Sequence, residues 1–255
     1  MAKLVSVITS AYNAADTLQN CVDSIKSQSY AYWEHIIVDD GSIDNTWNLL
    51  SGMAASDPRI KILHQANMGQ AAGRNAAVRI AKGDYIALLD ADDYSVPDRL
   101  ALQVDFLEDN QKVDVLGGAI FNVSATGIDL GQSRLPGLHE VLAKNIFRMN
   151  PFFSSTVMAR KRFFSTMEGF FVDLPRSQDY DLWLRGYRRF RYHNLQVPLT
   201  YYKRKTAPNW RDARYFAIVV MRAIKRDKKP INYYWFVLRP LVATLLHQLR
   251  LRKPY

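Results

Sequence analysis

Residues 5–13, VSVITSAYN, begin with an apolar, β-branched run at 5–9, which predicts a buried strand, and end in the small and polar side chains of a turn. Three similar runs follow, at residues 35–38, 60–63 and 85–89. Amphipathic helical patterns lie between them, at residues 17–27, 46–55 and 71–81. Asp16 and Asp44 stand where the first two helices would take an N-cap. Strands that alternate with helices predict an α/β fold with a parallel sheet.

The pattern changes after Asp93. The sequence predicts helices at residues 98–108 and 179–188 and strands at residues 113–123, 156–159 and 196–202. From Arg211 onward it predicts two helices, separated by the charged turn at residues 225–230. We therefore expect a sheet with a mixed second half, followed by a helical C-terminal appendage.

The composition fits one catalytic domain with this appendage, because 255 residues with 48% hydrophobic content can bury a substantial core. The apolar run at residues 4–8 is too short for a secretory signal, and no stretch reaches the roughly 18 apolar residues of a spanning helix. The single Cys21 falls at helical spacing among apolar residues, which indicates a small core side chain in a reducing compartment. These features predict a cytoplasmic protein.

The positive charge is concentrated at the C-terminal end. The chain carries 34 Lys and Arg against 24 Asp and Glu, and residues 201–255 hold 14 of the former against 2 of the latter. The remaining residues are nearly neutral. A basic segment of this kind predicts an anionic partner, which could be phosphate, an acidic membrane surface or nucleic acid.

Polar residues follow three of the predicted strands directly. They are SAYN at residues 10–13, DDGS at 39–42 and DADD at 90–93. Because ligands bind beyond the carboxyl ends of strands in open parallel sheets, we expect these segments to meet at one edge. Acidic groups, an aromatic ring and small residues would then converge there.

The third of these segments places Asp90, Asp92 and Asp93 immediately after a buried strand, where three carboxylates would repel one another. A divalent cation relieves that repulsion, and hard oxygen ligands suit Mg²⁺ or Mn²⁺ with positions left for nucleotide phosphates. A solvated acidic turn before the next helix is the alternative. The three aspartates alone do not decide between these interpretations.

Further segments act together with this one. They are residues 5–13, residues 37–44 (IVDDGSID), residues 67–75 (NMGQAAGRN) and residues 83–86 (GDYI) leading into LDADD at 89–93. In this order they resemble the family 2 glycosyltransferases over roughly residues 4–205. The resemblance implies a GT-A-type, Rossmann-like mixed sheet flanked by helices. It also implies a glycosyltransferase domain at residues 1–209, with a nucleotide-binding half at 1–95 and an acceptor half at 96–209, before the basic tail at 210–255.

The resemblance assigns roles to residues of the nucleotide-binding half. Tyr12, after Ser10 in the first strand-end segment, would stack on the nucleotide base, and Asp39 or Asp40 would hydrogen-bond it. Arg74 would face the diphosphate or the sugar. Asp92 matches the metal ligand of the family, and Asp90 matches the residue that contacts ribose or metal. The alternatives are a partly buried loop aromatic for Tyr12 and a solvated helical arginine for Arg74.

A second diagnostic segment is SQDYDLWLR at residues 177–185. Asp179 matches the catalytic base of the family, and Gln178 stands where many members carry glutamate, though it can still hydrogen-bond an acceptor hydroxyl. The alternative for Asp179 is an N-cap of its own helix. Further on, Lys203, Arg204 or Lys205 would hold the diphosphate where relatives have a histidine, or would form a basic surface turn. His64 and His193 show no ligand spacing.

The resemblance implies an inverting transfer of a hexosyl or N-acetylhexosaminyl group from a nucleoside-diphosphate sugar, with UDP preferred, to an acceptor hydroxyl. Mn²⁺ or Mg²⁺ would be the cofactor. Bacterial cell-surface polysaccharide or glycolipid assembly is the expected setting. A nucleotidyltransferase is the alternative, but no glycine-rich triphosphate loop follows the first strand. A nucleic-acid-binding module is disfavoured because the body of the chain is nearly neutral.

The tail carries two apolar stripes at helical spacing. They comprise Phe216, Val219, Val220, Ala223 and Ile224, and then Ile231, Tyr234, Trp235, Leu238, Leu241, Val242, Leu245 and Leu249. Lysines and arginines flank both stripes, as in helices that lie in an anionic membrane interface. Our hypothesis is that residues 211–255 hold the enzyme at the cytoplasmic face of the membrane, near a lipid-linked acceptor. Packing of the two helices on the catalytic body or on a second copy of the chain is the alternative.

Overall fold

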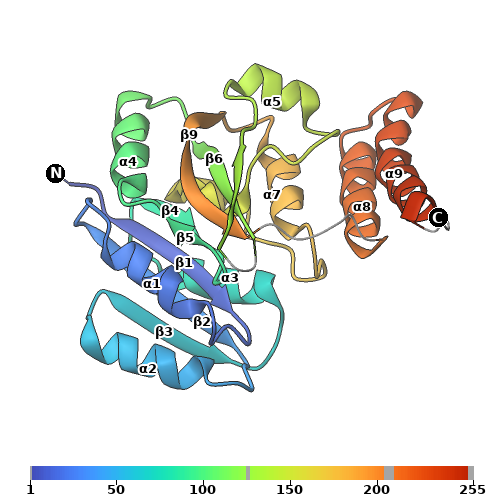
Figure 1. Ribbon diagram of the computed structural model, residues 1–255. Helices are drawn as coiled ribbons and strands as arrows, with labels where there is room; N and C mark the ends of the chain where they lie inside the picture. Colours follow the sequence, from blue (N-terminus) through green and yellow to red (C-terminus); the bar gives the residue numbers. More distant parts are fainter. Residues whose placement is uncertain (1, 125–126, 204–209, 252–255) are drawn as a thin grey trace.

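The computed structural model describes residues 2–124, 127–203 and 210–251, with side chains described up to residue 245 (Figure 1). Arg204 and Lys205 lie outside these residues. In the first half of the chain, four parallel strands stand in the order β3 (Ile60–Gln65), β2 (Trp33–Asp40), β1 (Val5–Ala11), β4 (Tyr85–Leu88). The helices between them are α1 (Leu18–Lys26), α2 (Thr46–Ser56) and α3 (Gln70–Ile80). The predicted alternation of strands and helices is confirmed.

The second half of the sheet is mixed. Beyond β4 the order continues with β8 (Met158–Arg160), β6 (Val115–Val123), β9 (Tyr192–Lys203) and β5 (Tyr94–Ser95), while β7 (Asp129–Ser133) pairs with β6. β8 is antiparallel to β4 and to β6, whereas β6 and β9 are parallel. The strand predicted at 156–159 begins only at Met158, because the preceding residues form a 3₁₀ turn, η1 (Ser154–Thr156).

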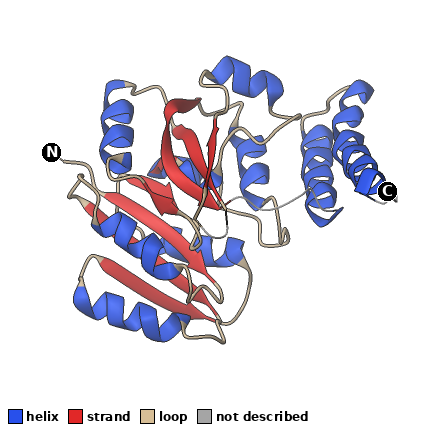
Figure 2. Cartoon of the chain, viewed as in Figure 1, coloured by secondary structure: helices blue, strands red, loops and turns tan. Residues whose placement is uncertain are grey.

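Helices cover both faces of the sheet (Figures 1 and 2). The remaining ones in the catalytic part are α4 (Arg99–Asp109), α5 (His139–Asn145), α6 (Lys161–Thr166) and α7 (Gln178–Gly186). Side chains alternate across each strand, so Val5 and Val7 of β1 pack with α1 and α4, whereas Ile8 belongs to the core on the α3 and α7 side. Because β1, β2 and β4 are parallel, their carboxyl ends lie at one edge of the sheet.

Two predicted N-caps are corrected by the structure. Asp16 does not cap α1, because the chain first turns through Ala14, whose carbonyl accepts the N–H groups of both Thr17 and Leu18. Asp179 is the second residue of α7 and not its N-cap, which is Ser177 in a left-handed conformation with φ of 58°. Asp44 precedes the cap position of α2, but its carboxylate accepts the N–H of Thr46 at 3.0 Å.

The tail forms α8 (Trp210–Arg226), a short 3₁₀ turn η2 (Ile231–Tyr234) and α9 (Trp235–Leu251). The hypothesis that the α8 stripe faces a membrane is wrong, since Val219, Val220, Ala223 and Ile224 are fully buried where α8 packs between α7 and α9. Hydrophobic burial and a ring contact to α7 explain this packing, which continues the core of the catalytic domain. No helix among the described residues is long and apolar enough to cross a membrane.

Candidate active site

A cavity of about 410 Å³ opens at the carboxyl ends of β1, β2 and β4. Its walls include six of the residues predicted from sequence or their near neighbours, namely Ser10, Tyr12, Asp16, Asp40, Asp90 and Asp92, and Lys203 closes it from the end of β9. Parallel strands that start from one side deliver their carboxyl ends to one edge, so the predicted convergence of these segments is met.

Tyr12 stands half-exposed at the mouth of this cavity. The next residue, Asn13, adopts a positive φ of 48°, and its side-chain oxygen accepts the N–H of Ile43 at 2.9 Å. Its own N–H donates to the Ser42 hydroxyl at 2.9 Å. These bonds hold the loop after β1 against the loop after β2. The position of the Tyr12 ring at the mouth of the cavity is therefore fixed.

The two aspartates after β2 have different surroundings. Asp39 is fully buried and lies 2.8 Å from Nδ1 of His64, which the parallel register places beside it on β3. Asp40 lines the cavity, but its carboxylate also holds the loop before α3. It accepts the N–H groups of Met68 at 3.0 Å and Gly69 at 2.8 Å. Sequence reasoning gave His64 no partner, because strand register cannot be read from one strand alone.

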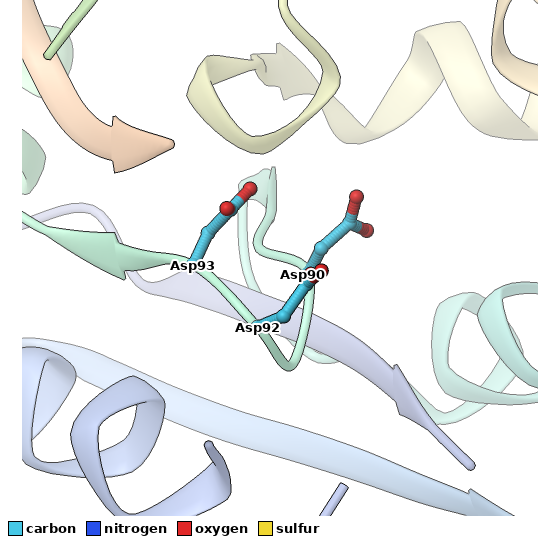
Figure 3. Close-up of side chains that lie close together, drawn as sticks. All are labelled: Asp90, Asp92 and Asp93. Atoms are coloured by element: carbon cyan, nitrogen blue, oxygen red, sulfur yellow. The ribbon is translucent and has the colours of Figure 1, made fainter. Parts of the chain in front are cut away.

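Three aspartates gather in the turn after β4 (Figure 3). One carboxylate oxygen each of Asp90, Asp92 and Asp93 lies within 4.8 Å of the others. Asp93 is buried, and it accepts a hydrogen bond from the Ser155 hydroxyl at 2.5 Å and from the N–H of Lys203 at 3.0 Å. Burial, with the two neighbouring carboxylates, raises the pKa of Asp93. Asp93 therefore anchors the turn, and Asp90 and Asp92 are the members that line the cavity.

Arg74 is buried on α3, which excludes the alternative of a solvated helical arginine. Its Nη2 donates to Oδ1 of Asp90 at 2.5 Å, and its guanidinium lies 5.4 Å from the centre of the Phe170 ring. Gln70, at the start of the same helix, donates to the same Asp90 oxygen at 3.1 Å. Asp90 is thus held in place by two donors from α3. Gln70 was not among the residues predicted from sequence, since a polar first residue is common in helices.

A second cavity, of about 490 Å³, adjoins the first and shares Gln70 and Asp90 with it. Its walls include Arg74, Ser154, Gln178, Asp179, Tyr202 and Arg211. The acidic turn after β4 and the head of α7 therefore face one continuous site. Gln178 donates to Oε1 of Gln70 at 2.6 Å, which bridges the two sides.

Asp179 projects from the first turn of α7, and its Oδ2 accepts the side-chain N–H of Asn150 at 3.2 Å. Within the described parts of the chain no donor pairs with Oδ1, and Asp179 lines the second cavity. The free N–H groups of a helix start favour a negative charge at this position. Asp179 can therefore act as a proton acceptor without losing its place.

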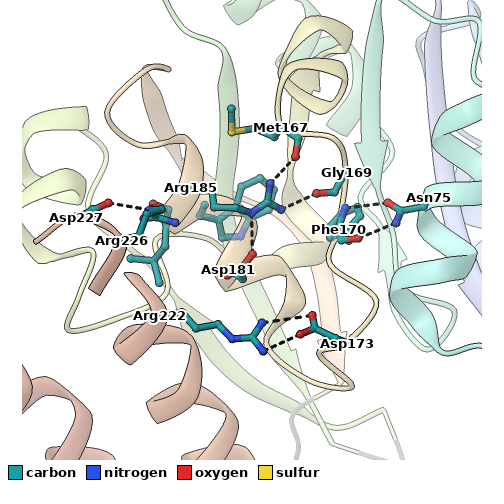
Figure 4. A network of polar contacts seen from close by, with 12 residues as sticks. Asn75, Met167, Gly169, Phe170, Asp173, Asp181, Arg185, Arg222, Arg226 and Asp227 are labelled. Carbon is teal, nitrogen blue, oxygen red and sulfur yellow. Dashed lines mark hydrogen bonds and ion pairs between the residues drawn. The ribbon is translucent and has the colours of Figure 1, made fainter. Parts of the chain in front are cut away.

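A network of polar contacts fixes α7 (Figure 4). Arg185 pairs with Asp181 one turn away at 2.8 Å, and it also donates to the carbonyls of Met167 and Gly169. Asn75 of α3 exchanges two hydrogen bonds with the backbone of Phe170, at 2.7 and 2.9 Å. The segment between α6 and α7 is thereby hydrogen-bonded to α3 and to α7. These contacts set the position of the start of α7 relative to the acidic turn.

The open mixed sheet, with an acidic turn after β4 and a carboxylate at the start of α7 in one cleft, has the GT-A fold of glycosyltransferases. The chain belongs to glycosyl transferase family 2, whose sequence model matches residues 6–167. This membership sets aside the nucleotidyltransferase and nucleic-acid-binding alternatives.

Two curated relatives support this membership. The chain is 36% identical over 255 residues to the Bacillus subtilis protein named "Putative glycosyltransferase EpsE", covering 95% of this chain and 89% of that one. It is 45% identical over 107 residues to WfaP of Escherichia coli, a UDP-Glc:α-D-GlcNAc-diphosphoundecaprenol β-1,3-glucosyltransferase, with 42% of each chain covered.

Among solved structures, TarS residues 1–349 of S. aureus in complex with UDP-GlcNAc superposes with a TM-score of 0.73. The sequence identity is 18%, and the superposition covers 95% of this chain and 71% of that one. The likeness shows that the two chains share their fold.

Proposed function

We propose that this enzyme transfers a hexosyl or N-acetylhexosaminyl group from a UDP-sugar to an acceptor hydroxyl, with inversion at the anomeric carbon. The observation that carries the proposal is the shared cleft, in which Asp90 and Asp92 lie on one side and Asp179 on the other. A donor bound at the first cavity would present its sugar toward Asp179. Of the two relatives above, WfaP is named for a UDP-sugar donor, which supports UDP here.

The first cavity suits a nucleotide. Tyr12 would stack on the base. Ser10 and Lys203 line the same cavity and would contact the ribose and the diphosphate. Each carboxylate oxygen can accept two hydrogen bonds, and among the described residues the N–H of Gly69 is the one donor to Oδ2 of Asp40. That oxygen could accept the imide N–H of uracil. Asp39 is too deeply buried for the same task and would act by orienting the loop and His64.

The acidic turn fits a divalent cation, because its clustered oxygens are hard ligands and line the cavity where the diphosphate would lie. Asp92 and the second oxygen of Asp90 would hold Mn²⁺ or Mg²⁺. A bound cation would supply neutralisation of the departing nucleoside diphosphate. Arg74 would keep the Asp90 carboxylate oriented and would not itself bind the diphosphate, which differs from the role that the resemblance implies.

On the acceptor side, Asp179 would take the proton of the attacking hydroxyl as the bond between sugar and phosphate breaks. Asn150 would hold the carboxylate and Gln178 would position the acceptor or the sugar. Attack from the side opposite the leaving diphosphate gives inversion. Arg204 lies outside the described residues, so its contact with the diphosphate stays a prediction.

The acceptor that we propose is a glycan or a lipid-linked glycan of the bacterial cell surface, met at the inner face of the membrane. WfaP, named for a diphosphoundecaprenol-linked acceptor, supports this class. Division of the chain into a catalytic domain at 1–209 and a tail at 210–255 belongs to the same proposal.

A donor-hydrolysis screen tests the function without knowledge of the acceptor. Purified full chain is incubated with UDP-, GDP- and dTDP-sugars in Mn²⁺, in Mg²⁺ and in EDTA, and released nucleotide is measured. We expect slow, cation-dependent release from a UDP-sugar. Hydrolysis of no sugar nucleotide, or equal release in EDTA, would overturn the proposal.

A further inference from the structure

A further cavity, of about 570 Å³, lies outside the active site, between the segment after α5 and helices α8 and α9. Its apolar walls come from Met149, Phe216, Phe236, Pro240 and Ala243. Asn145, Arg148 and Arg239 supply its polar groups. The wall residue Phe216 stacks on Tyr180, which follows the proposed base, with 4.9 Å between the ring centres. Through this ring contact the cavity adjoins α7, the helix that carries the proposed base.

The two arginines of this cavity carry positive charges that no carboxylate among the described residues neutralises. Both side chains are exposed, and in the described part of the chain neither guanidinium pairs with a carboxylate. Guanidinium groups bind phosphate through parallel N–H bonds. Two such groups beside apolar walls fit a ligand with a phosphate at one end and a hydrocarbon chain at the other.

An exposed apolar stripe begins in η2 and runs along α9 beside the cavity. Its members are exposed at 44–86% and recur every three or four residues, at Ile231, Trp235, Leu238, Val242 and Leu245. The opposite face of the helix is packed, with Val237 and Thr244 buried. Arg239 lies between the stripe and the cavity, one turn from both Trp235 and Val242. The stripe and the cavity therefore form one continuous surface.

The charge around this surface decides what covers it. Lys225 in the last turn of α8 and Lys228 in the turn that follows are exposed, and Arg239 adds a third cation, whereas Arg226 pairs with Asp227. A second copy of the chain, docked through the same face, would bring like charges together, which is unfavourable. An anionic lipid surface complements both the apolar stripe and the cations.

We propose that the stripe of α9 lies in the interface of an anionic membrane and that the adjoining cavity binds the phosphate of an anionic phospholipid between Arg148 and Arg239. This inference deepens the membrane placement proposed above and does not depend on the identity of the donor. Since α8 is buried on the catalytic body, the surface would hold the acceptor side of the enzyme at a fixed distance from the bilayer.

Cosedimentation of the full chain with vesicles tests the inference. Vesicles of phosphatidylcholine with phosphatidylglycerol should pellet the protein at low salt, and vesicles of phosphatidylcholine alone should not. At about 1 kcal/mol per basic residue, the Arg148→Ala/Arg239→Ala variant should show a partition coefficient roughly 30-fold lower. Leu238→Gln/Val242→Gln should also bind less.

Matched variants control for charge and apolarity elsewhere on the surface. Lys112→Ala removes an exposed cation, and Leu102→Gln changes a leucine of α4 that is 43% exposed; both should bind like the wild type. Donor hydrolysis should be unchanged in all four variants, so a failure of the proposed function would be seen separately. Two outcomes would overturn the inference: full vesicle binding by the arginine variant, or a wild-type dimer that Leu238→Gln/Val242→Gln dissociates without any vesicle binding.

Discussion

The side-chain amide of Gln178 donates a hydrogen bond to Oε1 of Gln70 at 2.6 Å, and Gln70 passes a hydrogen bond on to Asp90 at 3.1 Å. This bridge joins the head of the acceptor-side helix to the acidic turn. A glutamate at position 178 could not donate to Oε1 when ionised, so Gln70 would have to turn its amide and face Asp90 with its oxygen. The glutamine therefore suits a neutral bridge across the cleft.

Gln70→Ala removes this bridge and one of the two α3 donors to Asp90. We expect kcat/KM for sugar transfer, or the rate of donor hydrolysis, to fall about tenfold, because a hydrogen bond to a charged group is worth roughly 1.5 kcal/mol or more. Gln19→Ala is the control, since Gln19 makes its side-chain contact with Asp23 on the exposed face of α1. Equal rates for the two variants would show that the bridge has no part in the reaction.

Asp179→Asn tests the proposed base. The variant should bind UDP with nearly unchanged affinity and transfer sugar at least ~10²-fold more slowly, because an amide cannot accept the hydroxyl proton. Asp109→Asn, at an exposed position of α4, serves as the matched control. Binding by calorimetry and transfer to a mixed acceptor extract give the two readouts. Transfer near the wild-type rate by Asp179→Asn would remove Asp179 from the mechanism.

His35 makes the stability of the fold depend on pH. It is fully buried on β2, and burial lowers its pKa from 6.5 to about 3. The Thr9 hydroxyl donates to the Leu89 carbonyl, so it accepts from Nε2 of His35, which leaves Nδ1 without a partner in the described structure. The folded state therefore takes up this proton only near pH 3, whereas the unfolded state takes it up near pH 6.5.

Stability from this group is present above pH 6.5 and is lost as the pH falls toward 3, by up to about 1.4 kcal/mol per pH unit. His35→Leu removes the proton site, so its free energy of unfolding should change less between pH 7 and pH 5 than that of the wild type. Urea unfolding at the two pH values provides the measurement. An unchanged pH dependence in the variant would mean that His35 is not the group responsible.

Val220→Ala measures how firmly the tail is part of the catalytic body. Val220 is fully buried in α8, so the variant should lose roughly 1–3 kcal/mol of unfolding free energy through lost burial and a small cavity. Val242→Ala, at a position 44% exposed on α9, should lose much less. A single unfolding transition that shifts only for Val220→Ala is expected. Equal shifts would place α8 apart from the core.

Sequence patterns predicted the fold and the convergence of polar segments. Ser10, Asp39 and Asp90 each follow an apolar run, and the carboxyl ends of parallel strands lie at one edge of a sheet. They could not predict contacts that depend on register or on packing partners. Asp39 meets His64 only because β2 and β3 pair in one particular register. The burial of Arg74 on Asp90 likewise depends on how α3 is rotated against the sheet.

The tail shows the same limit. Helical spacing identified the apolar stripe of α8 but not its neighbours, which are the catalytic core and α9 and not a lipid surface. The stripe of α9 was identified by the same periodicity and stays uncovered. Periodicity thus tells which face of a helix is apolar, and only the three-dimensional structure shows what lies against that face.

Asp92 and Asp90 would hold a divalent cation, which would neutralise the charge of the diphosphate. Calorimetric titration of UDP into the wild type and into Asp92→Asn, in Mn²⁺ and in EDTA, tests this assignment most directly, with thermal unfolding to verify that the variant is folded. We predict that Mn²⁺ strengthens UDP binding at least tenfold in the wild type and has little effect in Asp92→Asn. Mn²⁺-dependent UDP binding of equal strength in both proteins would contradict the assignment.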